Sequence, residues 1–211
     1  ASLPMQRVYR IVESAAPSKA PIYIVGDSGT GKEVCADAIH RRSPRAGGPF
    51  VALSCATIPR GAQEAELFGR ASEAGSGAFA RAHSGTVYLE DVAELDAPLQ
   101  TKLVRWLETG FIEPESGGAP VYSDARIVCG GARDPRVEAQ AGRLREDLFF
   151  RLNVIAIQLP PVREREDDAV LLARHALRRF AAEEKKPFRD IDSDAEYALR
   201  TYPWPGNVRE I

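Results

Sequence analysis

The sequence predicts an α/β fold: a parallel β-sheet covered by helices on both faces, followed by a small all-helical subdomain. Five short apolar runs alternate with segments of helical character, at 21–26, 50–53, 86–91, 125–131 and 154–159. Continuous apolar strands that alternate with helices are typical of parallel sheets buried on both faces. After Pro160 and Pro161 the pattern is helical and no strand pattern remains. We expect two units, residues 1–162 with the sheet and residues 163–211 with helices alone.

Composition excludes several classes of function. With 28 basic and 30 acidic residues the net charge is −2, so this segment has no overall positive field to attract nucleic acid. No apolar run approaches the roughly 18–20 residues of a membrane span, so we expect no membrane partner. The three cysteines are few, odd in number and widely spaced, which argues against a disulfide framework or a zinc site and is typical of a cytoplasmic protein.

The first apolar run leads into a glycine-rich turn, GDSGTGKE, at residues 26–33. It matches the phosphate-binding pattern G-x-x-x-x-G-K, with Glu33 where a serine or threonine usually follows. In such a turn backbone N–H groups surround phosphate oxygens, and Lys32 reaches the β- and γ-phosphates. A glycine-rich turn can also be only a turn, but the lysine and the strand–loop–helix context favour nucleotide binding. The expected binding residues are Gly26, Asp27, Ser28, Gly29, Thr30, Gly31, Lys32 and Glu33.

The third apolar run, TVYLED, ends in two acids, Glu90 and Asp91. Ligands of doubly wound sheets gather at the carboxyl ends of the strands, where these acids should lie close to the phosphate loop. Two solvated acids at a strand end are the alternative. We expect instead that the pair holds a metal ion and activates a water molecule.

Longer strings closely resemble the central ATPase domain of bacterial sigma-54-dependent transcriptional activators, a branch of the AAA+ superfamily. They are GDSGTGKE, AIHRRSPRAGGPF (38–50), AELFG (65–69), LREDLFFRLNVIAIQLPPVRERED (144–167) and WPGNVREI (204–211). The family resembles GESGTGKE at the phosphate loop, so Glu33 agrees with it. The resemblance implies a three-layer αβα domain with a five-stranded parallel sheet, a helical lid, ATP and Mg²⁺ as cofactors, and assembly into a hexameric ring.

Several roles follow from this resemblance alone. Glu90 takes the position that holds Mg²⁺, and Asp91 the position that polarises the attacking water. Arg145 and Arg151 match the pair from which the family draws its trans-acting arginine fingers, and Arg209 matches the lid arginine that senses the γ-phosphate. Each arginine could instead form only a surface ion pair. The family continues past WPGNVRE into a DNA-binding helix-turn-helix, so we expect a central piece of a longer regulator, often one with an N-terminal receiver domain.

Three departures from the family pattern surround the expected ATP site. The family resembles LFLDEI at the acidic strand end, whereas this chain has VYLEDV, so the order of the two acids is inverted. Ser54 stands where the family usually has an asparagine that restrains the catalytic acid. ARIVCGGARD resembles VRVIAATNRD, so Ala132 replaces an asparagine that monitors the γ-phosphate. Because a misplacement of about 1 Å can cost about a hundredfold in rate, we expect water activation to suffer more than binding.

A fourth departure concerns the loop that touches sigma-54. Only sixteen residues separate AELFG from TVYLED, and the family usually needs several more, including a GAFTGA motif. GAFARA (77–82) could be a decayed GAFTGA. Alternatively, GAFARAHSGT corresponds to the family's GRFELADGGT, the helix that leads into the acidic strand. We favour the second alignment, in which the loop is deleted and only RASEAGS remains.

We therefore expect a domain that binds ATP, hydrolyses it slowly or not at all, and uses nucleotide mainly to set its oligomeric form. Its expected partners are copies of itself, the housekeeping-sigma form of RNA polymerase, and DNA through a helix-turn-helix outside this chain. An active ATPase motor that remodels sigma-54 RNA polymerase is the alternative from a different class. A domain with an empty site that only oligomerises is the third.

Overall fold

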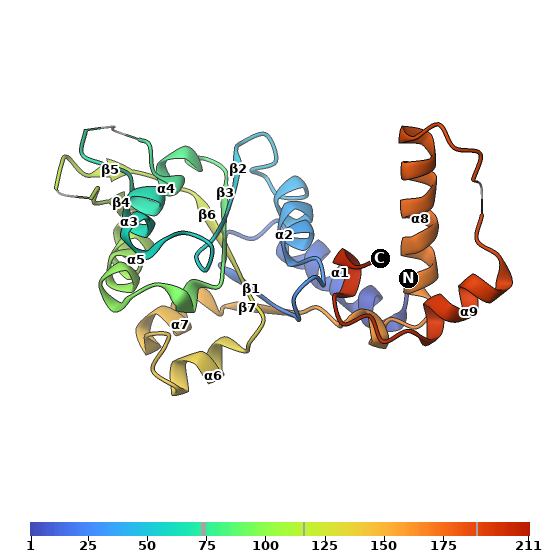
Figure 1. Ribbon diagram of the computed structural model, residues 1–211. Helices are drawn as coiled ribbons and strands as arrows, with labels where there is room; N and C mark the ends of the chain where they lie inside the picture. Colours follow the sequence, from blue (N-terminus) through green and yellow to red (C-terminus); the bar gives the residue numbers. More distant parts are fainter. Residues whose placement is uncertain (73–74, 116, 189) are drawn as a thin grey trace.

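A five-stranded parallel sheet forms the centre of the molecule, as the sequence predicts. The structure is a computed structural model that describes residues 1–72, 75–115, 117–188 and 190–211 (Figure 1). The strands run in the order β2-β3-β6-β1-β7. Their bounds are β1 Ile22–Val25, β2 Phe50–Ser54, β3 Thr86–Glu90, β6 Arg126–Gly131 and β7 Ile155–Gln158. All four neighbouring pairs are parallel, so the carboxyl ends of the strands meet at one edge.

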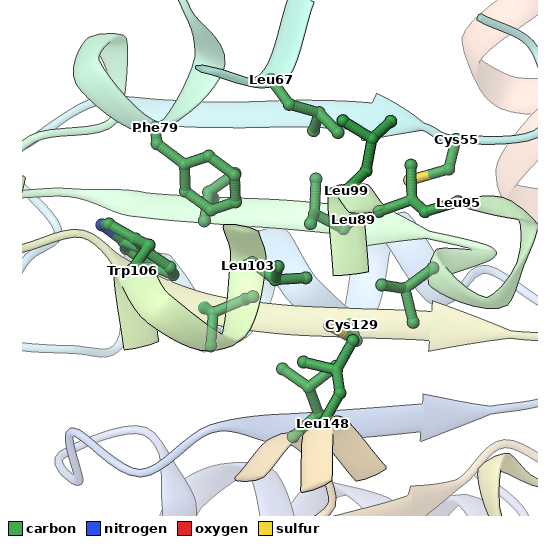
Figure 2. Packing of buried hydrophobic residues seen from close by; sticks show 14 of the residues in the cluster. Cys55, Leu67, Phe79, Leu89, Leu95, Leu99, Leu103, Trp106, Cys129 and Leu148 are labelled. Carbon is green, nitrogen blue, oxygen red and sulfur yellow. The ribbon is translucent and has the colours of Figure 1, made fainter. Parts of the chain in front are cut away.

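Helices cover both faces of the sheet. One face packs against α1 (Leu3–Ala15) and α2 (Lys32–Arg41) through a cluster of aliphatic side chains and Tyr88. The other face packs against α3 (Arg60–Phe68), α4 (Ala78–Arg81), α5 (Ala97–Thr109), α6 (Pro135–Gln140) and α7 (Glu146–Leu152). Figure 2 shows Leu89 and Cys129 of the sheet in one hydrophobic cluster with Leu103 and Trp106 of α5. Burial of these side chains on both faces explains the continuous apolar runs in the sequence.

Local sequence sets the ends of several elements. The Asp96 side chain accepts a hydrogen bond from the Leu99 amide and caps α5, and Gly110 ends that helix with a φ of 75°. A short antiparallel pair, β4 (Phe111–Ile112) with β5 (Val121–Tyr122), lies beyond α5. The apolar periodicity did not predict this pair, because two-residue strands are too short to show alternation.

The segment before β3 forms the packed helix α4. Phe79 of α4 is completely buried, and its ring centroid lies 5.4 Å from that of Phe68 and 4.3 Å from that of Trp106. Gly77 packs so tightly that a Cβ there would come within 2.4 Å of the Gly69 amide nitrogen. The GAFARA string is therefore part of the core rather than an exposed loop. Glu73 and Ala74, in the middle of RASEAGS, lie outside the described residues.

The C-terminal part consists of helices. The helix α8 (Asp168–Glu183) packs against α9 (Ser193–Thr201), and both stand to one side of the sheet (Figure 1). A short turn, η3 (Asn207–Arg209), returns the chain to the carboxyl edge of the sheet. No helix in the described part of the chain combines the length and apolar character that a membrane span requires.

Candidate nucleotide-binding site

The phosphate loop lies between β1 and α2, as expected. Gly29 and Gly31 have φ values of 78° and 96°, a region that residues with a Cβ adopt rarely. No atom lies within 4 Å of the position that a Cβ of Gly31 would take, so the loop is open there. Thr30 closes the turn by donating its hydroxyl to the Asp27 carbonyl at 2.8 Å. The loop therefore has the backbone conformation of a phosphate cradle at a helix N-terminus.

Lys32 and Glu90 meet across the carboxyl edge of the sheet. The Lys32 side chain is 5% exposed, and its Nζ donates to the carbonyl oxygens of Gly26 at 3.0 Å and Asp27 at 3.3 Å. The same Nζ lies 3.2 Å from Oε1 of Glu90. Glu33, in the first turn of α2, is exposed. The structure thus brings the loop lysine and the first acid of TVYLED together.

Asp91 follows β3 in a left-handed conformation, with a φ of 56°. It borders a cavity of 190 Å³ that Ala132 and Glu138 also line. Burial raises the pKa of Asp91, the charge of Glu90 raises it further, and Lys32 partly opposes both effects. Glu90 and Asp91 are therefore close enough to influence each other, but they face different surroundings.

The two positions where the family resemblance predicts asparagine lie beside these acids. Ser54 pairs with Glu90 in the register of β2 and β3. Ala132 follows β6, and its nearby backbone amide lowers the pKa of Asp91, opposing the effect of burial. The Ala132 side chain is a methyl group, so it offers no donor to a water molecule or a phosphate oxygen. Residue 132 therefore offers Asp91 its backbone amide, but alanine does not provide the side-chain amide that asparagine would.

An apolar cavity of 460 Å³ adjoins the phosphate loop at Gly31. Its lining includes Met5 and Val8 of α1, Leu159 after β7, and Val208 of the C-terminal turn. An apolar slot of this size beside a phosphate cradle suits a planar heterocyclic base. Sequence reasoning did not find these residues, because an amphipathic helix such as α1 looks the same whether its apolar stripe contacts a core or a ligand.

The C-terminal turn η3 is attached directly to the phosphate loop. Asn207 is 1% exposed; its Nδ2 donates to the Ser28 carbonyl at 2.9 Å, and its Oδ1 accepts from the Val162 amide at 2.9 Å. The Val208 amide donates to the Gly29 carbonyl at 2.9 Å. Arg209 therefore lies beside the loop, and its side chain is exposed. Apart from its place in the WPGNVREI string, no sequence signal identified Asn207, because it contacts a residue 179 positions away in the chain.

A buried arginine adds a second connection between the lid junction and the loop. Arg165 is 5% exposed, and its guanidinium donates to the Pro160 carbonyl at 2.9 Å and the Thr30 carbonyl at 2.8 Å. Burial lowers the pKa of Arg165, and the nearby Asp168 partly opposes this effect. The sequence showed only a run of charges here, which is usually a solvated face.

Arg145 and Arg151 lie away from the phosphate loop. Arg145 forms an ion pair with Asp147, with 2.7 Å between Nη2 and Oδ2, and Arg151 forms one with Glu108. Both side chains are about two-fifths exposed. In the described part of the chain, neither arginine forms an ion pair with Glu90, and their partners are Asp147 and Glu108.

The acidic side chains of the site limit how it could hold a metal ion. In residues 1–72, 75–115, 117–188 and 190–211 there is no group of three or more histidine, cysteine or acidic side chains that could hold one. Mg²⁺ usually takes one or two carboxylates together with phosphate oxygens and water. Glu90 therefore fits Mg²⁺ only as one ligand among several that a nucleotide and solvent would supply.

The amino-acid sequence matches two known protein families. Residues 1–158 match the family described as Sigma-54 interaction domain, and residues 163–211 match the AAA+ ATPase lid domain. The regulatory protein LuxO of Vibrio cholerae is 45% identical over 214 residues, which cover 98% of this chain and 47% of that protein. The transcriptional regulator NtrC of Klebsiella pneumoniae is 42% identical over 98% of this chain and 46% of its own length. This chain thus spans about half the length of these relatives.

A solved structure resembles the whole chain. NtrX from Brucella abortus in complex with ATP superposes with a TM-score of 0.92 at 38% identity, covering 100% of this chain and 49% of NtrX. The complex of NtrX with ADP superposes with a TM-score of 0.93. The sheet, the flanking helices and the C-terminal helices described above therefore share their arrangement with a protein that binds both nucleotides.

Proposed function

This chain belongs to the sigma-54 interaction domain family of bacterial transcriptional regulators, and we propose that it binds ATP, hydrolyses it slowly or not at all, and does not act through sigma-54. In this proposal nucleotide binding mainly sets the oligomeric form of a longer regulator. The observation that carries the proposal is an asymmetry in the site: the groups for binding a nucleotide are complete, but those around Asp91 are not.

The binding half of the site supports ATP as the ligand. The glycine conformations, the buried Lys32 and the apolar cavity beside Gly31 together provide a phosphate cradle and a slot for a base. Asn207 and Arg165 fix the loop to the lid. Bound Mg²⁺ would neutralise phosphate charge, with Glu90 as its protein ligand.

The hydrolytic half supports a low rate. Asp91 is one methylene shorter than the glutamate that the family pattern places there, so its carboxylate reaches less far. Ser54 and Ala132 lack the amide side chains that would restrain the acid and orient a water molecule. Arginine fingers contribute about a thousandfold or more to turnover, but they do not replace a group that orients water.

The region between α3 and β3 supports the loss of sigma-54 contact. The Glu115 amide donates to the Gly69 carbonyl at 2.8 Å, and the Arg70 and Glu115 side chains form an ion pair at 3.7 Å. This region is therefore attached to the segment that connects β4 and β5. A connection of only sixteen residues between AELFG and TVYLED, with its first residues held in this way, has little reach toward a partner.

The assembly and the partners of the regulator can be inferred from the same proposed function. Copies of this domain would assemble into a ring, with Arg145 and Arg151 directed at the nucleotide of a neighbour. The housekeeping-sigma form of RNA polymerase would be the partner in the cytoplasm, and a helix-turn-helix outside this chain would bind DNA. The exposed, ion-paired state of both arginines supports the assembly, because such pairs exchange partners at little cost.

Two measurements on the purified chain test the proposal. Calorimetric titration should detect ATP binding that Lys32→Ala abolishes, and a phosphate-release assay should give turnover well below one per second. Turnover near one per second or above, lost in Lys32→Ala, would establish the active sigma-54 motor instead. A lack of binding heat at high protein concentration would leave only an oligomerising role. As a positive control, the combination E90D, D91E, S54N and A132N is expected to raise phosphate release.

A further inference from the structure

Tyr88 carries a hydroxyl group that none of the roles described above uses. The residue lies on β3 two positions before Glu90, on the sheet face covered by α1 and α2. It is 1% exposed, and its hydroxyl oxygen has no hydrogen-bond partner among the described residues. Buried hydroxyl groups without a partner are uncommon, because each keeps the cost of leaving water. The group therefore requires an explanation.

The neighbouring strand has a gap that this hydroxyl fills. A Cβ on Gly130 of β6 would lie 2.2 Å from the Tyr88 hydroxyl oxygen and 3.0 Å from two of its ring carbons. In the family strings quoted above, phenylalanine corresponds to Tyr88 and alanine to Gly130, so the additional hydroxyl group of this chain coincides with the absence of a methyl group. Tyr88 and Gly130 are therefore a sterically matched pair.

This gap lies next to the acid that faces the phosphate loop. Glu90 pairs with Gly130 in the register of β3 and β6, and Tyr88 and Glu90 project from the same face of β3 because side chains alternate along a strand. A phenol ordinarily has a pKa of about 10, well above neutral pH. The hydroxyl thus keeps its proton and can act as a donor.

We infer that Tyr88 is a positioning residue for Glu90, with a hydroxyl that donates to the Glu90 carboxylate once Lys32 no longer pairs with it. Lys32 Nζ lies 3.2 Å from Oε1 of that carboxylate. When phosphate oxygens attract Lys32, Glu90 loses this partner, and its side chain can rotate toward the hydroxyl. A carboxylate held by a neutral donor stays charged and oriented as a metal ligand. This inference rests on the proposed nucleotide binding.

The test uses Tyr88→Phe, which removes only the hydroxyl. In the unliganded protein this change is expected to raise the melting temperature by about 2–4 °C, because a buried group without a partner is removed. The affinity for ATP with Mg²⁺ is expected to fall about five- to tenfold. The affinity for ATP in EDTA should not change. A purely structural tyrosine would not weaken binding in a Mg²⁺-dependent manner while the fold becomes more stable.

Two further variants make the result specific. Tyr23→Phe removes a buried hydroxyl on the opposite face of the sheet, where it lies 2.9 Å from the Cβ position of Gly131, and should leave the Mg²⁺ dependence unchanged. In a Glu90→Gln background, Tyr88→Phe should have no additional effect on affinity. Equal losses with and without Mg²⁺, or no loss at all, would overturn the inference alone. Absence of ATP binding by the unaltered chain would overturn the proposed function and the inference together.

Discussion

Glu90 and Lys32 join the two halves of the nucleotide site, with 3.2 Å between Oε1 and Nζ. Lys32 belongs to the phosphate loop, which follows β1. Glu90 is the last residue of β3, and β6 lies between these two strands. An anionic ligand must compete with this carboxylate for the lysine. If the chain binds ATP as proposed, the affinity therefore depends on the charge at position 90.

Glu90→Gln should separate two effects of the Glu90 charge, its competition with ATP for Lys32 and its role as a ligand of Mg²⁺. Without Mg²⁺, we expect ATP to bind about tenfold more tightly, because the competing negative charge is removed. The gain in affinity that Mg²⁺ normally adds should shrink, since the metal loses its carboxylate. Calorimetry in Mg²⁺ and in EDTA measures both. Glu94→Gln, which neutralises an exposed acid in the next turn, is the control, and an identical change in that variant would contradict the prediction.

Gly130→Ala should destabilise the fold by about 1–3 kcal/mol, because the new methyl group overlaps the Tyr88 hydroxyl. Adding Tyr88→Phe should recover most of that loss. Urea unfolding of the two single variants and the double variant measures the coupling free energy between the positions. If the changes in the free energy of unfolding were additive, the side chains at positions 88 and 130 would not compete for the same space.

Asn207→Asp should weaken the attachment of the lid to the phosphate loop. The substitution keeps an acceptor for the Val162 amide but replaces the donor to the Ser28 carbonyl with a second oxygen. Both residue types tolerate the φ of 54° at this position. We expect a loss of about 1–3 kcal/mol in the free energy of unfolding, together with weaker ATP binding. Unchanged affinity in a destabilised protein would confine Asn207 to a structural role.

Arg151→Ala should leave the stability of the single domain nearly unchanged, since the exposed pair with Glu108 contributes at most about 1 kcal/mol. If Arg151 contacts nucleotide in a neighbouring copy, assembly in Mg²⁺ and ATP should be lost. Sedimentation velocity with and without nucleotide measures this. Arg105→Ala, which breaks another exposed ion pair, with Glu113, is the matched control. Equal assembly of both variants would remove Arg151 from the interface.

His40→Gln should remove part of the pH dependence of stability. The Nδ1 of His40 lies 2.9 Å from the Thr86 hydroxyl oxygen, and burial lowers the pKa of the imidazole below its usual 6.5. The unfolded chain therefore binds the proton first as the pH falls, so stability present above about pH 6.5 is lost below it. Urea midpoints at pH 7.5 and 5.5 should differ less in the variant than in the unaltered chain.

Much of the fold could be predicted from local sequence. The five apolar runs became the five strands. The central strands β1, β3 and β6 are covered on both faces, so nearly every position in them is buried, whereas the edge strands β2 and β7 are only partly buried. The pair β4–β5 could not be predicted, since each strand has only two residues. The phosphate loop was found because its glycines and Lys32 act within eight consecutive residues. Met5 and Arg165 were not found, since their contacts with the loop depend on segments far away in the chain.

The sheet, the phosphate-loop pattern and the acids at the end of β3 could be predicted from the amino-acid sequence, because they depend on periodicity and on spacing within one element. Which groups meet at the carboxyl edge depends on the three-dimensional fold. It paired Lys32 with Glu90, placed Asn207 on the loop, and set the Tyr88 hydroxyl in the space left by Gly130. Such contacts depend on strand order and side-chain packing, which a linear pattern of residues does not specify.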